Sequence, residues 1–293
     1  MEVNTGRILA MAGLPQYDVR PFARCIKPQE YARLVGDPAA PLVHRAYQAS
    51  FSPGSTFKII NSSASLQEGL CTPHSVFSCG GSYAGANCFV TSGHGAISFE
   101  DSLAQSCDVV YYMLGDRPGI GRLGNYCRQF GLGAPTGLDL PAEVSGILPN
   151  PAWKKKWVKD EWYSGDTVNM SIGQGFLVVT PLQMAVATAA VANGGKVVRP
   201  HVVLKAELNG RVGFKDNTRP VRRVKVKPEL LAAVRRGMRG AVLRGTGGAC
   251  NSDKIKVAGK TGTVESFPSP FNPHGRNHTW WVSFAPYEKP EIA

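Results

Sequence analysis

The sequence lacks the features that identify membrane-spanning, repeat and disordered proteins. No apolar run reaches the roughly 18 residues of a membrane-spanning helix. The first residues do not follow the charged and then apolar pattern of a signal peptide. We find no internal repeat and no low-complexity block. Charged residues make up 18% of the chain and hydrophobic residues 43%, so the 293 residues have the composition of a globular protein with a large core.

Acidic residues are scarce relative to basic ones. The chain has 21 acidic and 33 basic residues, a formal net charge of +12. Most basic residues are scattered, which argues against nucleic acid as a partner. Two segments concentrate them: WKKKWVK (153–159) and RPVRRVKVK (219–227), of which the second alternates like a half-buried strand. We expect a solvated face at both, although the first could touch lipid headgroups or an anionic polymer such as a cell-wall glycan.

The expected elements mix helices and strands. Caps and periodicity predict helices over residues 28–35, 55–69, 98–105, 108–115, 180–194 and 228–243. Alternation and turn signals predict a hairpin over 1–13, strands over 196–206, 220–226 and 254–265, and a loop over 71–95. Strands near both ends with helices between them indicate an α+β fold whose sheet closes by bringing the ends of the chain together.

The stretch FSPGSTFKII (51–60) places Lys58 one helical turn after Ser55, directly behind a Pro-Gly pair. One interpretation is an ordinary helix start, with a serine cap and a solvated lysine. The other is a nucleophile, Ser55, with its base, Lys58. In the second interpretation Gly54 lets the chain turn sharply, so that Ser55 starts the helix facing a neighbouring strand.

A second segment, SCD (106–108), lies between two expected short helices. Extended or turn backbone would point Ser106 and Asp108 to one side and Cys107 to the other. The alternative is a pair of ordinary helix-capping residues.

A third segment, GKTGT (259–263), lies on the expected strand over 254–265. Lys260 supplies a positive charge, and Thr261 and Thr263 supply hydroxyls, which together suit a carboxylate. Gly262 would leave room for a ligand backbone to lie against the strand. A plain strand with a solvent-facing lysine is the alternative.

Together, STFK, SCD and KTGT resemble the three active-site motifs of the serine penicillin-recognising enzymes. Flanking segments such as GHGAISFEDSLAQSCDVVYY, SIGQGFLVVTPLQMAVATAAVANGG and VAGKTGTVE extend the resemblance to the transpeptidase domain of class B penicillin-binding proteins, over nearly the whole chain. Asp108, where many relatives carry asparagine, favours the elongation type, penicillin-binding protein 2. The resemblance implies a central antiparallel sheet flanked by helices, with a mainly helical subdomain.

In such a domain Ser55 would attack the penultimate D-Ala carbonyl of a stem peptide and form an acyl-enzyme. Lys58 would take the proton of Ser55, and we expect burial, the helix N-terminus and nearby Lys260 to favour its neutral form. Ser106 would relay the proton to the leaving amine, and Asp108 would bond Lys58 or the substrate amide.

The remaining roles fall on the strand and on the backbone. Lys260, Thr261 and Thr263 would hold the substrate carboxylate, with Gly262 between them. Backbone N–H groups of Ser55 and Thr263 would form the oxyanion hole. A second stem peptide's amine would resolve the ester into a cross-link, or water would give D,D-carboxypeptidase activity. No cofactor is expected for catalysis.

The resemblance also implies a setting in the cell. We expect residues 1–293 to be a transpeptidase domain truncated at both ends, without its membrane anchor, pedestal domain, last strand and final helix. The full-length protein would sit in the bacterial inner membrane with this domain facing the periplasm. Its partners would be peptidoglycan stem peptides, β-lactams, a membrane-embedded glycosyltransferase and the elongation machinery, and no nucleic acid.

Two rival functions remain open. A class D β-lactamase shares S-x-x-K and K-T-G, but its middle motif carries no acidic or amide third residue. Those enzymes are also shorter between these motifs, whereas Ser106 and Lys260 lie 154 positions apart here (260 − 106). A β-lactam-sensing receptor domain would be acylated without turnover.

Seven cysteines cannot all pair. Cys79, Cys88, His94 and Cys107 cluster along the chain, and three thiolates with an imidazole form a good tetrahedral zinc set. Some elongation-type relatives resemble this, with a metal bound by a loop ahead of the second motif. We expect a structural zinc at these four residues. A Cys79–Cys88 disulfide and unrelated free thiols are the alternatives.

Overall fold

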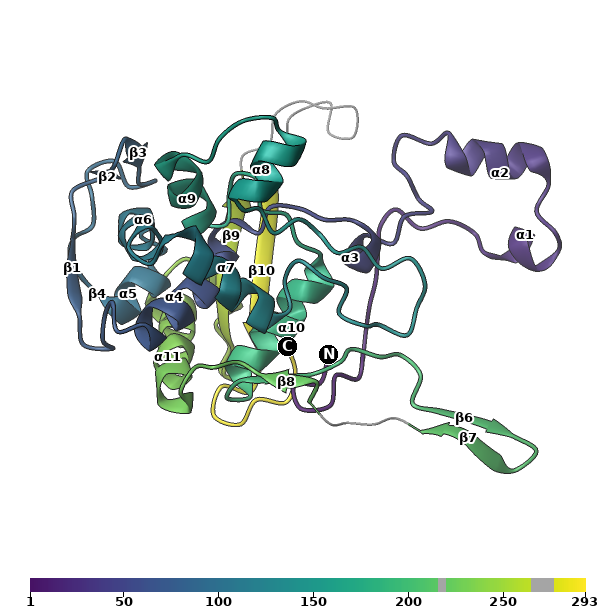
Figure 1. Cartoon of the computed structure of the whole chain (residues 1–293). Coiled ribbons are helices and arrows are strands. Elements are labelled where there is room, and N and C mark those ends of the chain that lie inside the picture. Colours follow the sequence, from purple (N-terminus) through teal and green to yellow (C-terminus); the bar gives the residue numbers. More distant parts are fainter. Residues whose placement is uncertain (216–219, 265–276) are drawn as a thin grey trace.

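The computed structural model describes residues 1–215, 220–264 and 277–293 (Figure 1). Its helices and 3-10 turns are α1 (Arg20–Ala23), α2 (Pro28–Val35), α3 (Arg45–Gln48), η1 (Gly54–Phe57), α4 (Lys58–Gln67), α5 (Phe99–Ala104), α6 (Asp108–Asp116), α7 (Gly119–Phe130), α8 (Pro151–Trp157), α9 (Ser164–Ser171), α10 (Pro181–Ala192), α11 (Pro228–Arg244) and η2 (Gly248–Cys250). Its strands are β1 (Val76–Cys79), β2 (Ser82–Tyr83), β3 (Ala86–Asn87), β4 (Gly95–Ser98), β5 (Lys196–Val197), β6 (Lys205–Leu208), β7 (Arg211–Lys215), β8 (Arg222–Arg223), β9 (Ala258–Val264) and β10 (His278–Phe284). Within the described ranges, none of these helices is long and apolar enough to cross a membrane.

An antiparallel strand pair, β9 and β10, stands in the middle of the molecule (Figure 1). Its register places Lys260 of β9 opposite Val282 of β10. α11 packs along β9, and α10 packs along β10. The Met1 amine donates to the Ala293 carbonyl at 2.8 Å, and the Ala293 N–H donates to the Met1 carbonyl at 2.9 Å. The α+β architecture is therefore confirmed, and so is the meeting of the two ends of the chain.

The helix α4 is buried along nearly its whole length, although many of its side chains are polar. Asn61 Nδ2 donates to the carbonyl oxygens of Tyr111 at 3.2 Å and Ser171 at 2.9 Å. The Ser62 hydroxyl shares a hydrogen bond of 2.7 Å with the Tyr111 hydroxyl. Buried polar groups whose hydrogen bonds are satisfied specify one arrangement of their elements. These bonds therefore fix α4, whose first residue is Lys58, against α6 and α9.

All six predicted helices are present, with their ends displaced by a few residues at most. The strand predictions were less successful. The expected hairpin over 1–13 is a tight turn whose arms bridge distant segments, Glu2 to Ile292 and Arg7 to His201. The expected loop over 71–95 contains β1, β2 and β3, and the expected strand over 196–206 holds only β5 and the start of β6. α7, α8 and α9 were not predicted. Strand pairing depends on partners that lie far away in the sequence, so local alternation predicts it poorly.

Two expected segments extend beyond the described residues. The strand predicted over 254–265 is observed as β9, and residue 265 lies outside the described ranges. In the basic segment 219–227, residue 219 also lies outside them. From residue 220 onward its basic side chains are exposed and Val224 and Val226 are buried, which confirms the predicted half-buried alternation.

Candidate active site

Ser55 lies in the first turn of η1, at a position that requires a glycine before it. Gly54 has a φ of +52°, and a Cβ on it would lie 2.8 Å from the Val264 side chain and 2.9 Å from the Thr263 carbonyl oxygen. Both neighbours belong to β9, so the absent side chain lets η1 approach that strand directly. The Gly54 N–H also donates to the Gly173 carbonyl at 2.9 Å. The sharp turn that we expected at Gly54 is therefore present, and it brings Ser55 against β9.

Lys58 is completely buried at the start of α4. Its Nζ donates to Asp108 Oδ1 at 2.6 Å, to the Ser106 carbonyl at 2.8 Å and to Ser106 Oγ at 3.2 Å. The Tyr111 ring centroid lies 5.3 Å from the same nitrogen. The solvated-lysine interpretation of this segment is therefore wrong, because the amine faces the second motif inside the protein.

The ion pair between Lys58 and Asp108 bears on one expectation from the sequence. We expected burial, the helix N-terminus and Lys260 to favour a neutral Lys58. The structure places Asp108 Oδ1 2.6 Å from Lys58 Nζ, so a carboxylate has to be counted beside those influences. The neutral form of Lys58 stays a prediction.

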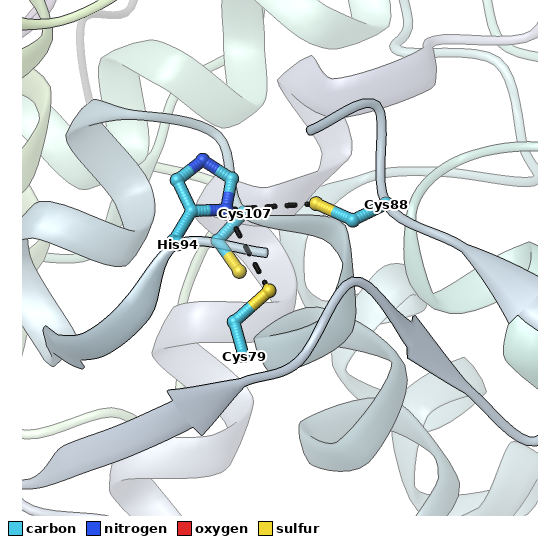
Figure 2. Close-up of side chains that lie close together, drawn as sticks. All are labelled: Cys79, Cys88, His94 and Cys107. Atoms are coloured by element: carbon cyan, nitrogen blue, oxygen red, sulfur yellow. Dashed lines mark hydrogen bonds between the residues drawn. The ribbon is translucent and has the colours of Figure 1, made fainter. Parts of the chain in front are cut away.

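The second motif is a tight turn between α5 and α6. Ser106 has a φ of +59°, a backbone conformation that is unusual for a residue other than glycine. The next residue, Cys107, is extended and caps α6. Ser106 and Asp108 both reach Lys58, whereas Cys107 points to the opposite side, toward Cys79 (Figure 2). The predicted opposite directions are therefore confirmed.

The third motif supplies a buried cation that has no carboxylate within bonding distance among the described residues. Lys260 is completely buried on β9, and its Nζ donates to the Thr261 carbonyl at 3.0 Å. Burial lowers the pKa of Lys260 well below its usual value, and the charge of Lys58 lowers it further. Thr261 is half-buried and Thr263 is exposed. The hydroxyls of Thr261 and Thr263 lie on the same strand as Lys260. The charged form of Lys260 is disfavoured by burial, and a bound anion would stabilise it.

Gly262 has a different role from the one that we expected. A Cβ there would lie 2.8 Å from the Pro53 carbonyl oxygen and 3.0 Å from Thr56 Cγ2. Gly262 lines the cavity, but the room that its missing side chain leaves is filled by η1. The prediction that it leaves room for a ligand backbone is therefore corrected: it lets the turn that carries Ser55 pack on β9.

The three motifs line one cavity of about 690 Å³. Its lining residues are Ser55, Asn87, Cys88, Phe89, Ser106, Asp108, Tyr112, Ile172, Gln174, Thr246, Thr261, Gly262, Thr263 and Asn277. Sequence reasoning missed Thr246, whose hydroxyl shares a hydrogen bond of 2.5 Å with that of Thr261. Its only signal in the sequence is the glycine-rich turn RGTGG after α11, which does not point to this strand.

Four side chains behind the second motif converge on one point (Figure 2). They are Cys79, Cys88, His94 and Cys107, whose ligand atoms all lie within 4.8 Å of one another. The sulfurs of Cys79 and Cys88 each lie 3.6 Å from His94 Nδ1. All seven cysteines of the chain are free thiols in the structure. The structure therefore brings the four predicted residues together, and Cys79 and Cys88 do not form a disulfide in it.

Short strands and tight turns build this cluster. β1 pairs with β4, which places Cys79 opposite Gly95. The Cys88 N–H donates to the Gly81 carbonyl at 2.8 Å. A Cβ on Gly93, whose φ is +78°, would lie 2.2 Å from the Cys79 carbonyl oxygen, so only glycine allows this close approach. The glycines of residues 71–95, which suggested a plain loop, therefore allow this segment to fold back on itself.

The surroundings of the cluster change the pKa values of its members. Burial raises the pKa of Cys79, but hydrogen bonds from His94, Gly81 and the neighbouring thiols outweigh it and lower the pKa overall. Burial raises the pKa of the Cys107 thiol and lowers that of His94. One thiol is thus easier to ionise than usual, and the imidazole favours its neutral form, which is the form that binds a metal.

Two residues of the cysteine cluster are direct neighbours in the chain of residues at the catalytic site. Cys88 precedes Phe89, and Cys107 precedes Asp108. The Phe89 N–H donates to Asp108 Oδ2 at 3.2 Å, while Oδ1 of the same carboxylate receives Lys58. The position of Asp108 therefore depends on the segment that carries the cysteines.

Comparison with known proteins agrees with this geometry. Residues 1–293 match the family model of the penicillin-binding protein transpeptidase domain. The chain is 33% identical to the peptidoglycan D,D-transpeptidase MrdA of Salmonella typhimurium over 310 residues, which cover 99% of this chain and 50% of that protein. The chain thus spans about half the length of the curated relatives it matches.

Solved structures give the same result. The crystal structure of Pseudomonas aeruginosa PBP2 in complex with WCK 5153 has a TM-score of 0.88 and 31% identity, covering 100% of this chain and 64% of that one. The complex between PBP2 and MreC from Helicobacter pylori has a TM-score of 0.84 and 31% identity, covering 99% and 53%. The expected fold and the likeness to penicillin-binding protein 2 are both confirmed. This chain belongs to the penicillin-binding protein transpeptidase domain family.

Proposed function

We propose that this chain is a peptidoglycan D,D-transpeptidase that forms an acyl-enzyme on Ser55, and that β-lactams acylate the same residue. The observation that carries the proposal is one cavity lined by Ser55, by Ser106 and Asp108, which both bond Lys58, and by residues 261–263 of β9. The names of the relatives, peptidoglycan D,D-transpeptidases, support the same activity.

The proton steps follow the contacts of Lys58. Ser55 Oγ attacks the carbonyl carbon between the two terminal D-alanines of a stem peptide, and the neutral amine of Lys58 takes the hydroxyl proton. When the C–N bond breaks, Ser106 Oγ, 3.2 Å from Lys58 Nζ, passes a proton to the leaving amine and receives one from Lys58. The amine of a second stem peptide then attacks the ester and restores Ser55. Water in place of that amine gives D,D-carboxypeptidase activity.

The other wall of the cavity binds charge. Lys260, Thr261 and Thr263 bind the terminal carboxylate of the substrate, with Gly262 keeping the strand against η1. The Ser55 and Thr263 backbone N–H groups stabilise the oxyanion, each contributing about 2.7 to 4 kcal/mol to transition-state binding. A carboxylate raises the low pKa of Lys260 again, so substrate binding charges this lysine where the charge is needed.

Labelling with fluorescent penicillin tests the proposal. The wild-type chain should form a covalent label that lasts many minutes, and Ser55→Ala should form none while its circular dichroism spectrum stays unchanged. Covalent label on Ser55→Ala would move the nucleophile elsewhere. Loss of the wild-type label within seconds would mean a β-lactamase. A stable label without turnover of D-Ala-D-Ala substrates would mean a sensor.

We also propose that Cys79, Cys88, His94 and Cys107 hold a structural zinc ion. Three sulfurs and one imidazole nitrogen that converge within 4.8 Å of one another fit a closed tetrahedral site. The ion would neutralise the thiolates and fasten the segment of β1 to β4 to the turn at Cys107. All four positions would be filled by protein, so the ion would supply no catalytic chemistry.

Elemental analysis of protein purified without added metal tests the zinc proposal. We expect about one zinc per chain and its loss in Cys107→Ser. Cys127→Ser is the matched control, since Cys127 is buried away from the cluster and should keep the metal. A zinc content near zero in the wild-type chain, or a Cys79–Cys88 bridge by mass spectrometry, would contradict the proposal.

We further propose that the chain is the transpeptidase part of a longer, membrane-anchored protein that faces the periplasm. It would work beside a membrane-embedded glycosyltransferase and the elongation machinery. Its span of about half of its relatives supports this, as do the similar structures of a complex between PBP2 and MreC and of a peptidoglycan synthase complex. A groove of about 560 Å³ along β10, lined in part by Trp280, Val282 and Ala293, has room for a further strand. Co-purification of the full-length protein with the glycosyltransferase tests the partnership.

A further inference from the structure

The basic segment 153–159 is largely exposed, as its sequence predicts, except for Lys154 and the half-buried Trp153. Lys154, in the middle of α8, is buried, and its Nζ bonds Asp166 at 2.8 Å and Asp160 at 3.1 Å. The same nitrogen lies 4.7 Å from the centroid of the Tyr163 ring and 5.8 Å from that of the Phe176 ring. A paired cation between two rings holds them in place before any ligand arrives. The segment is therefore held in one arrangement by Lys154, which we call its anchor, while its other side chains form a surface.

Aromatic rings continue outward from this anchor in a row. Phe176 meets Trp153 at a centroid distance of 5.5 Å. Trp157 follows Trp153 by four residues on α8, so the two side chains share one face of the helix. Phe176 is 36% exposed and Trp157 is 66% exposed. We call Phe176, Trp153 and Trp157 the aromatic strip.

The strip begins close to the cavity that contains Ser55. The Gly54 N–H donates to the Gly173 carbonyl, and Gln174 lines the cavity. Phe176 follows Gln174 by two residues, so their Cα atoms are at most about 7 Å apart. α8, at the far end of the strip, lies beside α9 (Figure 1). The strip therefore leads away from the reacting centre along the protein surface.

The charges beside the strip are of both signs, and two of the positive ones are unpaired. Lys155 is paired with Glu161 at 2.8 Å. Lys156 and Lys159 are exposed and have no carboxylate partner among the residues that the structure describes, and Lys156 Nζ lies 4.9 Å from the centroid of the Trp157 ring. A row of rings edged by free ammonium groups is complementary to a polymer with apolar faces and anionic groups.

We propose that the aromatic strip binds the sugar chain of peptidoglycan, beyond the stem peptide that reaches Ser55. The C–H faces of pyranose rings pack on aromatic rings, and the carboxylates of the polymer meet Lys156 and Lys159. Binding energy from this remote part of the substrate places the peptide at the cavity. The inference rests on the proposed transpeptidase function for the choice of polymer, because peptidoglycan is the substrate of that function.

Peptide-free glycan strands prepared from bacterial peptidoglycan test the strip without any reaction. The wild-type chain should bind them, and Trp157→Ala should raise the dissociation constant about tenfold. Phe176→Ala should have a similar effect. The acylation rate with fluorescent penicillin should stay unchanged in both variants, since neither residue lines the cavity.

Two controls keep the test specific. Tyr31→Ala removes an exposed ring from α2 and should leave glycan binding unchanged. Tyr163→Phe keeps the ring beside Lys154 and removes only the hydroxyl that bonds Asp160, so it should also bind normally. Equal weakening in the Tyr31 variant would overturn the assignment to this strip.

The remaining outcomes separate this inference from the proposed function. Absence of glycan binding by the wild-type chain, or wild-type binding by Trp157→Ala, would overturn the inference. Binding to anionic phospholipid vesicles that Trp157→Ala abolishes, with glycan binding unaffected, would make the strip a lipid contact and also overturn it. A wild-type chain that binds glycan but takes no penicillin label would contradict the transpeptidase function and leave the strip supported.

Discussion

The two walls of the cavity each bury a lysine completely, yet they treat its charge in opposite ways. On the wall of α4 and the SCD turn, Asp108 lies 2.6 Å from Lys58. On the wall of β9, Lys260 bonds a backbone carbonyl, and burial holds its pKa well below the usual value. A buried ammonium with a carboxylate beside it is compensated within the protein, whereas one without a carboxylate is compensated by a ligand. The first wall is therefore suited to proton transfer and the second to recognition of an anion.

The largest effect should come from removing the lysine of the first wall. Lys58→Ala should lower the acylation rate by about 10²- to 10⁴-fold, because Ser55 keeps its proton. Stopped-flow labelling with penicillin measures this rate. The binding of non-covalent carboxylate ligands should change little. A near-normal acylation rate would mean that Ser106 or Lys260 acts as the base.

Lys260→Met should slow the reaction less than Lys58→Ala does, and it should make the folded chain more stable. Carboxylate recognition should fall, seen mainly as weaker binding before acylation. The free energy of unfolding near neutral pH should rise, because the variant no longer buries a charge that burial disfavours. Urea unfolding of the two proteins measures this difference. A less stable Lys260→Met would show that this lysine is compensated within the fold after all.

Gly262→Ala tests how the two walls fit together. The added Cβ would lie 2.8 Å from the Pro53 carbonyl oxygen, and backbone cannot move away as a flexible side chain can. We expect a loss of about 1 to 3 kcal/mol in unfolding free energy, together with slower acylation, because η1 is pushed off β9. Gly121→Ala, at an exposed position of α7 where an added Cβ meets nothing within 4 Å, is the control for the stability effect alone. If Gly262 served the ligand only, stability would be unaffected.

The smallest effect is a pH dependence that belongs to the second wall. Because the pKa of Lys260 is lowered in the folded chain, the unfolded chain binds more protons between that pKa and the usual 10.5. The free energy of unfolding therefore rises as pH rises through that window. Below the window the destabilisation by the buried charge is fully present. Carboxylate affinity should fall as pH rises above the lowered pKa, since Lys260 of the folded chain loses its charge there. Titration of binding and unfolding in wild type and Lys260→Met should show both slopes in the wild type only.

Part of the site follows from local sequence alone. The Pro-Gly pair before Ser55, the helix that begins at Lys58 and the opposite directions of Ser106 and Cys107 all depend on a few consecutive residues. The α+β layout and the six helices could be predicted for the same reason, whereas the active-site motifs were identified by their resemblance to a known family. Backbone preferences, capping and side-chain alternation act over one or two turns, where chain connectivity already places the atoms.

Tertiary structure decided the contacts that give these residues their environments. The approach of Asp108 to Lys58, the bond from Phe89 to Asp108 and the burial of Lys154 join segments whose distance in space no local pattern encodes. Gly262 shows the difference most clearly: the sequence indicated a residue without a side chain, and only the packing of Pro53 on β9 decided what fills the space. Burial and charge pairing are properties of the folded neighbourhood, so the same lysine side chain becomes a proton carrier on one wall and an anion receptor on the other.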